Sequence, residues 1–377
     1  MNSTNNTTTD IPIFSTTSLA SKLDDELDQS GLEAFLLSLD FILAFVNLSG
    51  NTLTIVALNL SKKLSALLSN QFIFNLALSD ILVGLSILYH DLFYIGVGYE
   101  KIKYLCILKF VFIFFACSSS IYNLFGIAAD RYLAVVYPLH YSKYMTKKVA
   151  LLINCTGWIT ALSLAMTILW WNNYDEAHQD CKLVNVVPEA YTTYVTTPMF
   201  VMIWMVMLVL YAKIWNEARV HTKRLKNAMG CIRGTVPDDS KSIQLICFIL
   251  GCFSICWLPY FIYIMVVRIY GPVYSNQVYE IAFTMAMANS CMNPIIYAWK
   301  NKNFRTAFWC LLHCKSPNSV HKRNFVTNHV PNIKRLSVCN VASNFSFDDH
   351  DAEMSCSERK GSDANFSVQT TNSSLHY

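Results

Sequence analysis

The chain has few charged residues for its length. Of its 377 residues, 14% are charged and 54% are hydrophobic, whereas soluble domains carry roughly 25% charged residues. This composition is typical of a protein that is embedded in a membrane. The net charge of +4 reflects the distribution of lysine and arginine around that membrane, so it gives no support to nucleic-acid binding.

The first 33 residues lack both parts of a secretory signal peptide, a basic segment and an apolar segment. We therefore expect no cleavable signal here. Residues 1–33 are polar and acidic, and they form a predicted extracellular tail. Three acceptor sequences for N-glycosylation lie in this tail, at Asn2, Asn5 and Asn6.

Seven long apolar stretches follow this tail, and a membrane-spanning helix needs about 20 mostly apolar residues. They cover residues 34–60, 71–97, 104–136, 149–171, 191–215, 242–270 and 278–299. The predicted fold class is an all-α membrane protein, a seven-transmembrane helix bundle with a short amphipathic eighth helix. The bundle would occupy residues 34–300 and the eighth helix residues 301–315. A polar tail, residues 316–377, is expected to be disordered in the cytoplasm.

Lysine and arginine gather in alternate short loops. Lys62 and Lys63 follow the first stretch, Lys147 and Lys148 follow the third, and five basic residues follow the fifth. Because short cytoplasmic loops are rich in these residues, the N-terminus is expected outside the cell and the C-terminus inside. The predicted location is the plasma membrane, crossed several times.

Four of the 13 cysteines lie at or beyond the ends of the apolar stretches, in positions that suggest a chemical role. Cys106 and Cys181 lie on the predicted outer side, where an oxidising environment favours a disulfide between them. Cys310 and Cys314 lie in the amphipathic segment on the inner leaflet. These two are candidates for palmitoylation, with free thiols as the alternative.

Asp80 lies midway along the second apolar stretch. A carboxylate at that depth needs hydrogen-bond partners or a cation. The polar residues of other stretches that could surround it are Asn51, Ser120, Asn289, Ser290 and Asn293. Such a set of oxygens suits a hard monovalent cation. The alternative is a hydrogen-bonded group that only holds the helices together.

Asp130, Arg131 and Tyr132 end the third apolar stretch. Charged residues are costly at such a position and usually mark function, although Arg131 could also be a simple cytoplasmic flank.

Pro259 and Pro294 interrupt the sixth and seventh stretches, each near a bulky aromatic residue. Kinks on two consecutive helices favour a hinge over a purely architectural role.

Taken in order, one or more per stretch, these motifs resemble those of the rhodopsin-like (class A) G-protein-coupled receptors. The resemblance covers about residues 34–314. It rests on Gly50-Asn51, the run from Asn75 to Asp80, Cys106, Asp130-Arg131-Tyr132, Trp158, Cys181, Cys256-Trp257-Leu258-Pro259, Asn293-Pro294-Ile295-Ile296-Tyr297 and Phe304. The family resemblance implies a receptor, not an enzyme, that binds an extracellular ligand and activates a heterotrimeric G protein.

The resemblance also implies roles for individual residues. The switch that couples the receptor to its G protein would comprise Asp130, Arg131, Tyr132, Leu139, Tyr211, Asp239 and Tyr297. Ligand binding would be transmitted through Phe253, Trp257, Pro259, Asn293 and Pro294. An allosteric sodium ion would bind at Asp80, Ser120, Asn289, Ser290 and Asn293. Receptor kinases and arrestin would act on the cytoplasmic tail, unless that tail is inert.

Departures from the family pattern concern the ligand. Ile113 stands where biogenic-amine receptors carry an aspartate, and Met287 stands where opsins carry the retinal lysine. Ile203 replaces the usual proline of the fifth stretch, which is similar to melanocortin and cannabinoid receptors. The sixth and seventh stretches look more like adenosine and amine receptors, but the asparagine of adenosine receptors is Ile264 here. No subfamily matches throughout.

The predicted ligand pocket is largely apolar. Its apolar and aromatic candidates are Phe110, Ile113, Phe114, Cys117, Tyr260, Tyr263 and Phe283, and its polar candidates are His90, Asp91, Lys109 and Glu280. A small, largely apolar or aromatic ligand is the leading hypothesis. The alternative is a biogenic amine or peptide held by Asp91 or Glu280, unless Asp91 and Lys109 pair with each other.

Two other classes of protein have seven spans or buried polar residues. A transporter or channel needs a continuous polar path, but the buried polar residues here gather at one depth around Asp80. An intramembrane enzyme needs a nucleophile with its base, or a metal cluster. His90 and His221 lie at opposite ends of the predicted bundle, so neither class is favoured.

Overall fold

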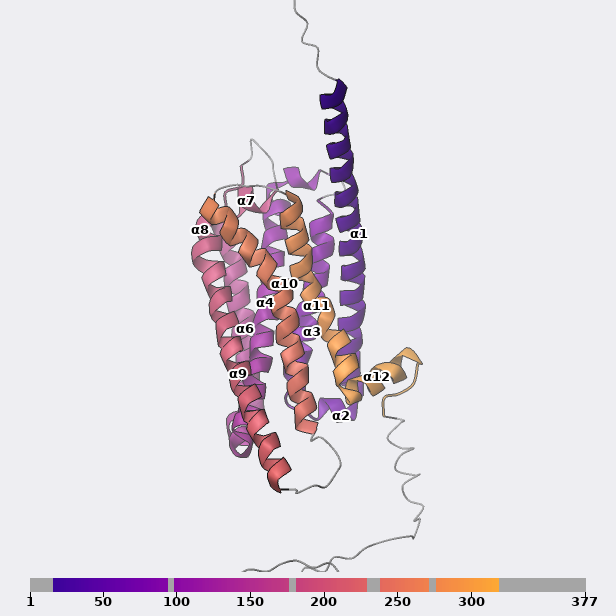
Figure 1. Ribbon diagram of the computed structural model, residues 1–377, viewed down its shortest axis with the longest axis vertical. Coiled ribbons are helices and arrows are strands. Elements are labelled where there is room, and N and C mark those ends of the chain that lie inside the picture. Colours follow the sequence, from indigo (N-terminus) through magenta and orange to yellow (C-terminus); the bar gives the residue numbers. More distant parts are fainter. Residues whose placement is uncertain (1–15, 94–97, 176–180, 229–237, 271–275, 319–377) are drawn as a thin grey trace, which may run out of the picture. The chain divides into compact units, whose positions relative to one another are not determined.

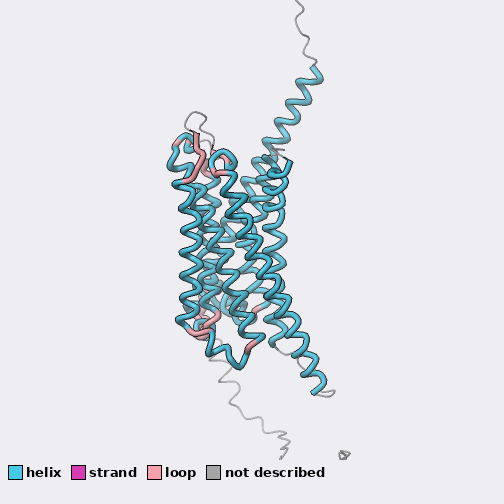
Figure 2. Tube along the Cα trace, turned by 90° about the vertical axis from the view of Figure 1, so that its left-hand side faces the viewer, coloured by secondary structure: helices cyan, strands magenta, loops and turns pink. Residues whose placement is uncertain are grey.

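Seven long helices form the structure, a computed structural model that describes residues 16–93, 98–175, 181–228, 238–270 and 276–318 (Figures 1 and 2). They are α1 (Thr16–Leu60), α3 (Asn70–Asp91), α4 (Lys103–Val136), α6 (Lys147–Trp170), α9 (Thr197–Ala228), α10 (Asp238–Tyr270) and α11 (Asn276–Lys300). The remaining elements are short: α2 (Lys62–Ser65), η1 (Tyr99–Lys101), η2 (Pro138–His140), α5 (Tyr141–Tyr144), α7 (Leu183–Val186), α8 (Glu189–Tyr191), η3 (Thr192–Thr196) and α12 (Lys302–Leu312). No strand occurs in these residues, which confirms the all-α fold class.

Six helices of the described part are long and apolar enough to cross a membrane, and α11 is the seventh long helix. Its lower hydropathy follows from polar side chains such as Asn289, Ser290 and Asn293, all of which are buried in the bundle. Membrane helices place such residues toward the bundle interior. The apolar stretches of the sequence therefore correspond to the seven helices.

Several helix ends differ from the predicted limits. Helix α1 begins at Thr16, inside the predicted tail, and Figure 1 shows this indigo helix extending past its neighbours. The segment before the apolar stretch contains no proline after residue 12, so nothing breaks the helix there. Helix α3 ends at Asp91 instead of residue 97, and α9 continues to Ala228. The connection between α9 and α10 is consequently shorter than predicted, and its residues 229–237 lie outside the described part.

The long helices pack side by side. Helix α4 contacts α3, α6 and α9, whereas α1 contacts α3 and α11, and α10 contacts α9 and α11. Close approach of α1 and α11 depends on Gly50, because a Cβ atom there would lie 2.9 Å from Pro294 Cγ. The neighbouring Asn51 donates from Nδ2 to the Ser290 carbonyl oxygen at 3.1 Å.

A disulfide between Cys106 and Cys181 confirms the predicted pair, with Cα atoms 5.7 Å apart. It ties the segment before α7 to the first turn of α4. At the other end of the bundle, α12 begins at a cap in which the Asn301 side chain accepts a hydrogen bond from the Asn303 amide at 3.0 Å. Phe304 is fully buried and stacks on Tyr297, with ring centroids 5.2 Å apart. Helix α12 is the predicted eighth helix.

Candidate functional site

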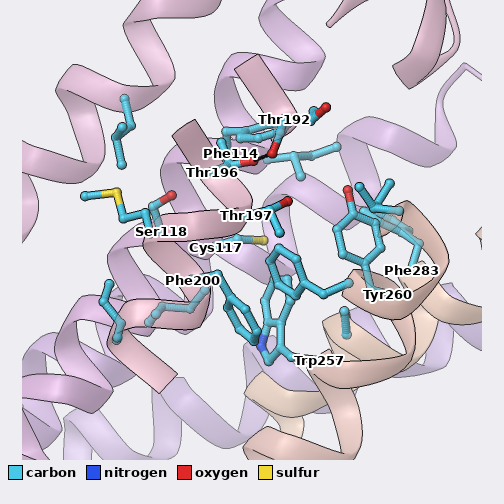
Figure 3. A pocket seen from close by; sticks show the side chains of 18 of the residues that line it. Phe114, Cys117, Ser118, Thr192, Thr196, Thr197, Phe200, Trp257, Tyr260 and Phe283 are labelled. Atoms are coloured by element: carbon cyan, nitrogen blue, oxygen red, sulfur yellow. Dashed lines mark hydrogen bonds between the residues drawn. The ribbon is translucent and has the colours of Figure 1, made fainter. Parts of the chain in front are cut away.

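A cavity lies among α4, α9, α10 and α11, with an empty volume of about 800 Å³ that includes its part open to solvent (Figure 3). Its walls are apolar, aromatic or neutral polar side chains, and none of those that the structure describes is charged. They are Ile113, Phe114, Cys117, Ser118, Ile121, Tyr122, Leu164, Thr192, Thr196, Thr197, Met199, Phe200, Ile203, Trp257, Tyr260, Phe261, Ile264, Phe283, Ala286 and Met287.

Three of the six hydroxyl-bearing residues that line the cavity are threonines at the start of the fifth long helix. Thr192 and Thr196 belong to the π-helix η3, and Thr197 is the first residue of α9. Figure 3 shows these three threonines on one side of the cavity, with Trp257 on the other. Short π-helical segments are rare and frequently occur at functional sites. The Thr197 hydroxyl is buried and has no hydrogen-bond partner in the described structure.

The floor of the cavity is a group of aromatic rings. Phe200 stacks on Phe261 with centroids 3.6 Å apart, and it also contacts Trp257 at 6.1 Å and Phe253 at 5.7 Å. Trp257 and Phe253 lie one turn apart on α10, which contains Pro259. The rings therefore connect the cavity to the part of α10 that continues toward the other end of the bundle.

Asp80 is fully buried, and both of its oxygens accept hydrogen bonds. Ser120 and Ser290 donate from Oγ to Asp80 Oδ1 at 2.7 and 2.8 Å, and Asn293 donates from Nδ2 to Oδ2 at 2.7 Å. Asn289 is buried one residue before Ser290. These contacts join α3, α4 and α11 at a single carboxylate.

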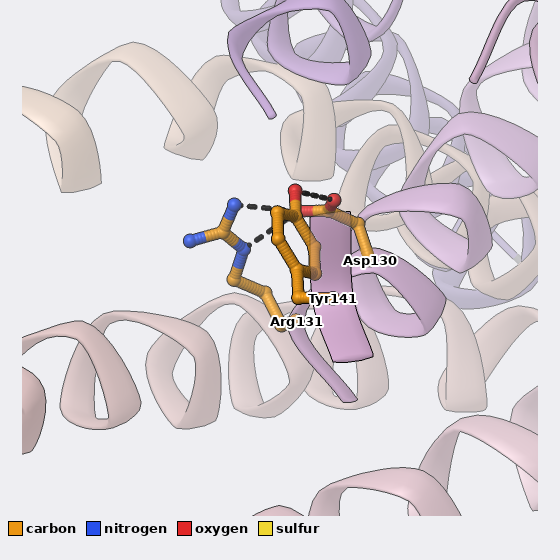
Figure 4. Close-up of polar contacts among 3 residues, drawn as sticks. All are labelled: Asp130, Arg131 and Tyr141. Carbon is orange, nitrogen blue, oxygen red and sulfur yellow. Dashed lines mark hydrogen bonds and ion pairs between the residues drawn. The ribbon is translucent and has the colours of Figure 1, made fainter. Parts of the chain in front are cut away.

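Asp130 and Arg131 lie near the end of α4 and form an ion pair (Figure 4). Arg131 Nε donates to Asp130 Oδ2 at 2.9 Å, and the Tyr141 hydroxyl donates to Oδ1 at 2.7 Å. Burial, followed by the hydrogen bond to Asp130, raises the pKa of the Tyr141 hydroxyl above its ordinary value. Tyr141 therefore stays protonated and donates, so both oxygens of Asp130 are occupied.

The other predicted switch residues come from several elements of the structure. Tyr211 of α9 and Tyr297 of α11 are buried, and the Tyr297 hydroxyl has no hydrogen-bond partner among the described residues. Leu139 is 93% exposed. Tyr132 makes an edge-to-face contact with Tyr137. The side chain of Asp239 lies outside the described part.

Comparison with known proteins identifies the fold. Residues 50–297, about two thirds of the chain, match the family described as 7 transmembrane receptor (rhodopsin family). The chain belongs to this family.

Individual members are distant. The histamine H2 receptor of Canis lupus familiaris is 31% identical over 285 residues, which cover 73% of this chain and 78% of that receptor. The adenosine receptor A2b of Homo sapiens is 30% identical over 304 residues, which cover 73% and 89%. As a member of this family, the chain is a membrane receptor that binds an extracellular ligand and couples to a G protein, as the motifs implied.

The predicted pocket residues of the receptor divide into two groups. Ile113, Phe114, Cys117, Tyr260 and Phe283 line the cavity. The others lie outside its walls, and several of them are buried nearby: Phe110, Tyr263, His90, Asp91, Lys109 and Glu280. Lys109 donates from Nζ to the Cys181 carbonyl oxygen at 3.1 Å and lies over the ring of Phe110.

Several residues that line the receptor's cavity were not predicted from the sequence. The threonines of η3 and α9 were not predicted, although their spacing places Thr192 and Thr196 on one helix face. Ile203 and Met287 were noted only as departures from other subfamilies, yet both line the cavity. Tyr141 was also missed as a partner of Asp130, because it follows a loop whose course the apolar pattern does not predict.

Proposed function

We propose that the receptor binds a small ligand with a largely apolar or aromatic body in the cavity between α4, α9, α10 and α11. The observation that carries this proposal is the uncharged lining of the cavity, which ends on Trp257. Ligand pockets are generally apolar, with a few polar groups that orient the ligand. Thr197 and its two neighbouring threonines are those groups.

Ligand binding would be transmitted from Trp257 to Phe253 and along α10, with Pro259 and Pro294 as the hinge positions. The switch proposed at the other end is Arg131, which pairs with Asp130 in this structure and would move toward Tyr211 and Tyr297 on activation. Two-state elements of this kind respond to a ligand that favours one state. Exposed Leu139 would pack against the G protein, and Asp239 would be a second partner of Arg131.

Asp80 would hold the sodium ion together with Ser120, Asn289, Ser290 and Asn293. A carboxylate with two serine hydroxyls within 2.8 Å is a set of hard oxygen donors, so these residues fit a monovalent cation. The ion would favour the arrangement in which α3, α4 and α11 meet at this carboxylate. Agonist binding would then decrease as sodium increases.

The receptor would lie in the plasma membrane with its N-terminus outside, and residues 1–33, 34–300, 301–315 and 316–377 would form its four parts. Glycans would attach at Asn2, Asn5 and Asn6, which lie outside the described residues. Of the two palmitoylation candidates, Cys314 is exposed and Cys310 is 1% exposed, so Cys314 is the better acceptor. Kinases and arrestin would act on residues 316–377.

A ligand screen tests the proposed function. Cells that express the receptor are treated with small aromatic compounds, and cyclic AMP and calcium are recorded against the basal signal. We expect at least one compound to act, with its response lost in Trp257→Ala and kept in Trp170→Ala, which removes a tryptophan that is 84% exposed. Normal surface expression without any response, or full response in Trp257→Ala, would contradict the proposal.

A second candidate ligand is an amine, because histamine receptors are among the relatives. Ile113 leaves no carboxylate at the position where amine receptors carry one. An amine would therefore need acidic partners elsewhere in the receptor.

A further inference from the structure

A second hollow lies at the end of the bundle opposite the Cys106–Cys181 disulfide, where α3 and α6 begin. Its empty volume is about 940 Å³, including the part that is open to the surroundings. Residues of α1, α2, α3, α6 and the connection between α2 and α3 line it. We call this hollow the α3–α6 groove. It shares no lining residue with the ligand cavity.

Amides and a single ammonium group form the polar part of this groove. The amides are those of Asn59, Asn70, Gln71, Asn75 and Asn154. Lys147 is charged, and none of the described residues that line the groove is acidic. Amides both donate and accept hydrogen bonds, whereas a lysine ammonium only donates them. The lining therefore favours a partner that is negatively charged and rich in oxygen.

Two of the amides hold the walls of the groove in place. Asn75 accepts at Oδ1 from Trp158 Nε1 at 3.1 Å, and it donates from Nδ2 to the Gln71 carbonyl oxygen at 2.8 Å. Asn70 donates from Nδ2 to the Leu64 carbonyl oxygen at 2.6 Å. These hydrogen bonds join α3 to α6 on one side and to α2 on the other.

Asn154 has no such role within the protein. It is 6% exposed, and its side chain makes no hydrogen bond to any residue that the structure describes. Native proteins pair nearly all buried polar groups with protein, water or ligand. The side chains of Asn59, Gln71 and Lys147 are exposed and are also unbonded within the described part. Four polar side chains of the groove are thus open to a partner, and one of them is buried.

Polar and apolar groups alternate along one face of α6. Lys147 is its first residue, Leu151 follows by four positions and Asn154 by seven, so all three lie on the same side of the helix. Leu151 is 62% exposed, and Phe74 of α3 also lines the groove. The groove is consequently cationic at the end of the bundle and apolar further along, with one amide two turns inside.

This order of groups matches a phospholipid that lies beside the helices. The phosphate of a phospholipid lies at the membrane surface, its ester carbonyl groups lie deeper, and its acyl chains deeper still. Lysine at the end of a membrane helix extends to the interface. Anionic lipids are found in the cytoplasmic leaflet, which surrounds this end of the bundle in the proposed orientation. A sterol offers one hydroxyl group and would leave most of the polar side chains without a partner.

We propose that the α3–α6 groove binds one anionic phospholipid. Its phosphate pairs with Lys147 and accepts a hydrogen bond from Gln71, and an ester carbonyl oxygen accepts from Asn154 Nδ2. Its acyl chains pack against Phe74 and Leu151. The lipid thereby joins the ends of α3 and α6, and its binding does not depend on the ligand of the cavity.

Lipid binding by the full-length purified receptor tests the proposal. Phosphatidylserine, phosphatidylinositol and phosphatidylcholine with the same acyl chains are added to the receptor in detergent, and bound lipid is counted by native mass spectrometry. We expect one lipid to bind, with an affinity for an anionic lipid about fivefold or more above that for phosphatidylcholine, whose choline cancels the charge of the phosphate. Glycerophosphoserine, the same headgroup without acyl chains, should not displace bound phosphatidylserine. Equal affinity for the three lipids, or displacement by the soluble headgroup, would overturn the proposal.

Substitution of Lys147 assigns the phosphate to the groove. Lys147→Gln removes the cation and should weaken phosphatidylserine binding about fivefold, whereas Lys147→Arg keeps the charge and should retain the affinity. Lys148→Gln is the matched control, because Lys148 is the next residue, is exposed and does not line the groove. Unchanged binding in Lys147→Gln, or an equal loss in Lys148→Gln, would overturn the assignment.

Substitution of Asn154 separates binding from folding. Asn154→Leu removes an unbonded buried amide and keeps a similar volume, so the lipid-free receptor should have a Tm equal to that of the wild type or higher. Its affinity for phosphatidylserine should fall about fivefold, because one hydrogen bond is lost. A lower Tm together with unchanged lipid affinity would mean that Asn154 serves the fold alone, and it would overturn the proposed contact.

Discussion

The buried carboxylates of the inner and the outer half of the bundle differ in how they are satisfied. Both oxygens of Asp80 and both oxygens of Asp130 accept hydrogen bonds from neighbouring side chains. Asp40 and Asp91 are just as deeply buried, yet each has an oxygen without a hydrogen bond in the described structure. The same type of group therefore occupies two different environments in one molecule.

This difference separates two uses of a buried charge. A carboxylate whose oxygens are all bonded holds helices in one arrangement, and removing it leaves several donors without a partner. A carboxylate with a free oxygen contributes less to the folded state, since its desolvation is only partly compensated. The hydrogen bonds of Asp80 and Asp130 join neighbouring elements of the structure, whereas Asp40 and Asp91 are not fully bonded.

Substitution of Asp80 is expected to have the largest effect on the free energy of unfolding. Asp80→Ala leaves Ser120, Ser290 and Asn293 without their acceptor, and each such buried group costs about 1–3 kcal/mol. We expect the free energy of unfolding to fall by at least about 3 kcal/mol, measured by thermal unfolding of the purified receptor. Asp80→Asn, which keeps one acceptor oxygen, should lose less stability and also lose sodium sensitivity of agonist binding. If Asp80→Ala lowers the free energy of unfolding by less than about 1 kcal/mol, Asp80 does not differ from Asp40 and Asp91 in its contribution to stability.

A smaller effect is expected at Asp130, where the charge restrains Arg131. Asp130→Asn removes the ion pair, which is worth roughly 1.5–3 kcal/mol for a hydrogen bond to a charged group. Basal guanine-nucleotide exchange on a purified G protein should therefore rise about tenfold or more. Arg131→Ala is the control and should abolish exchange while surface expression persists. A basal rate unchanged in Asp130→Asn would show that the pair does not restrain the switch.

Tyr141 should contribute less than the ion pair. Tyr141→Phe removes one hydrogen bond to Asp130 and keeps the ring, a change of about 0.5–1.5 kcal/mol. The expected result is a modest rise in basal nucleotide exchange, between those of the wild type and Asp130→Asn. Tyr144→Phe, which alters an exposed tyrosine one turn away, provides the matched control. Equal rates in both phenylalanine variants would remove Tyr141 from the switch.

The helices could be predicted from the sequence because apolar stretches of the required length are specific for membrane spans. Their ends could not, since Thr16 and Ala228 lie in polar turns that continue a helix outside the apolar stretch. Similarly, the hydropathy of the sequence does not distinguish the π-helix η3 from the α-helix that follows it.

The neighbours of Asp80 could be named from depth alone, because residues at one level of adjacent helices face each other in a bundle. For the ligand site this reasoning was insufficient. Asp91 and Glu280 were predicted to lie in the pocket, but neither lines the cavity. Which oxygens of a carboxylate are bonded depends on side-chain geometry, and no sequence pattern expresses it.

The smallest expected change in stability is also the most direct test of the comparison between the two groups of acids. The free energy of unfolding of the ligand-free double variant Asp40→Asn/Asp91→Asn is measured beside that of Asp80→Asn. The double variant should be as stable as the wild type or more stable, because it removes two buried charges that repel each other and Glu280. A loss of stability equal to that of Asp80→Asn would mean that the outer acids are structural, and it would contradict the account.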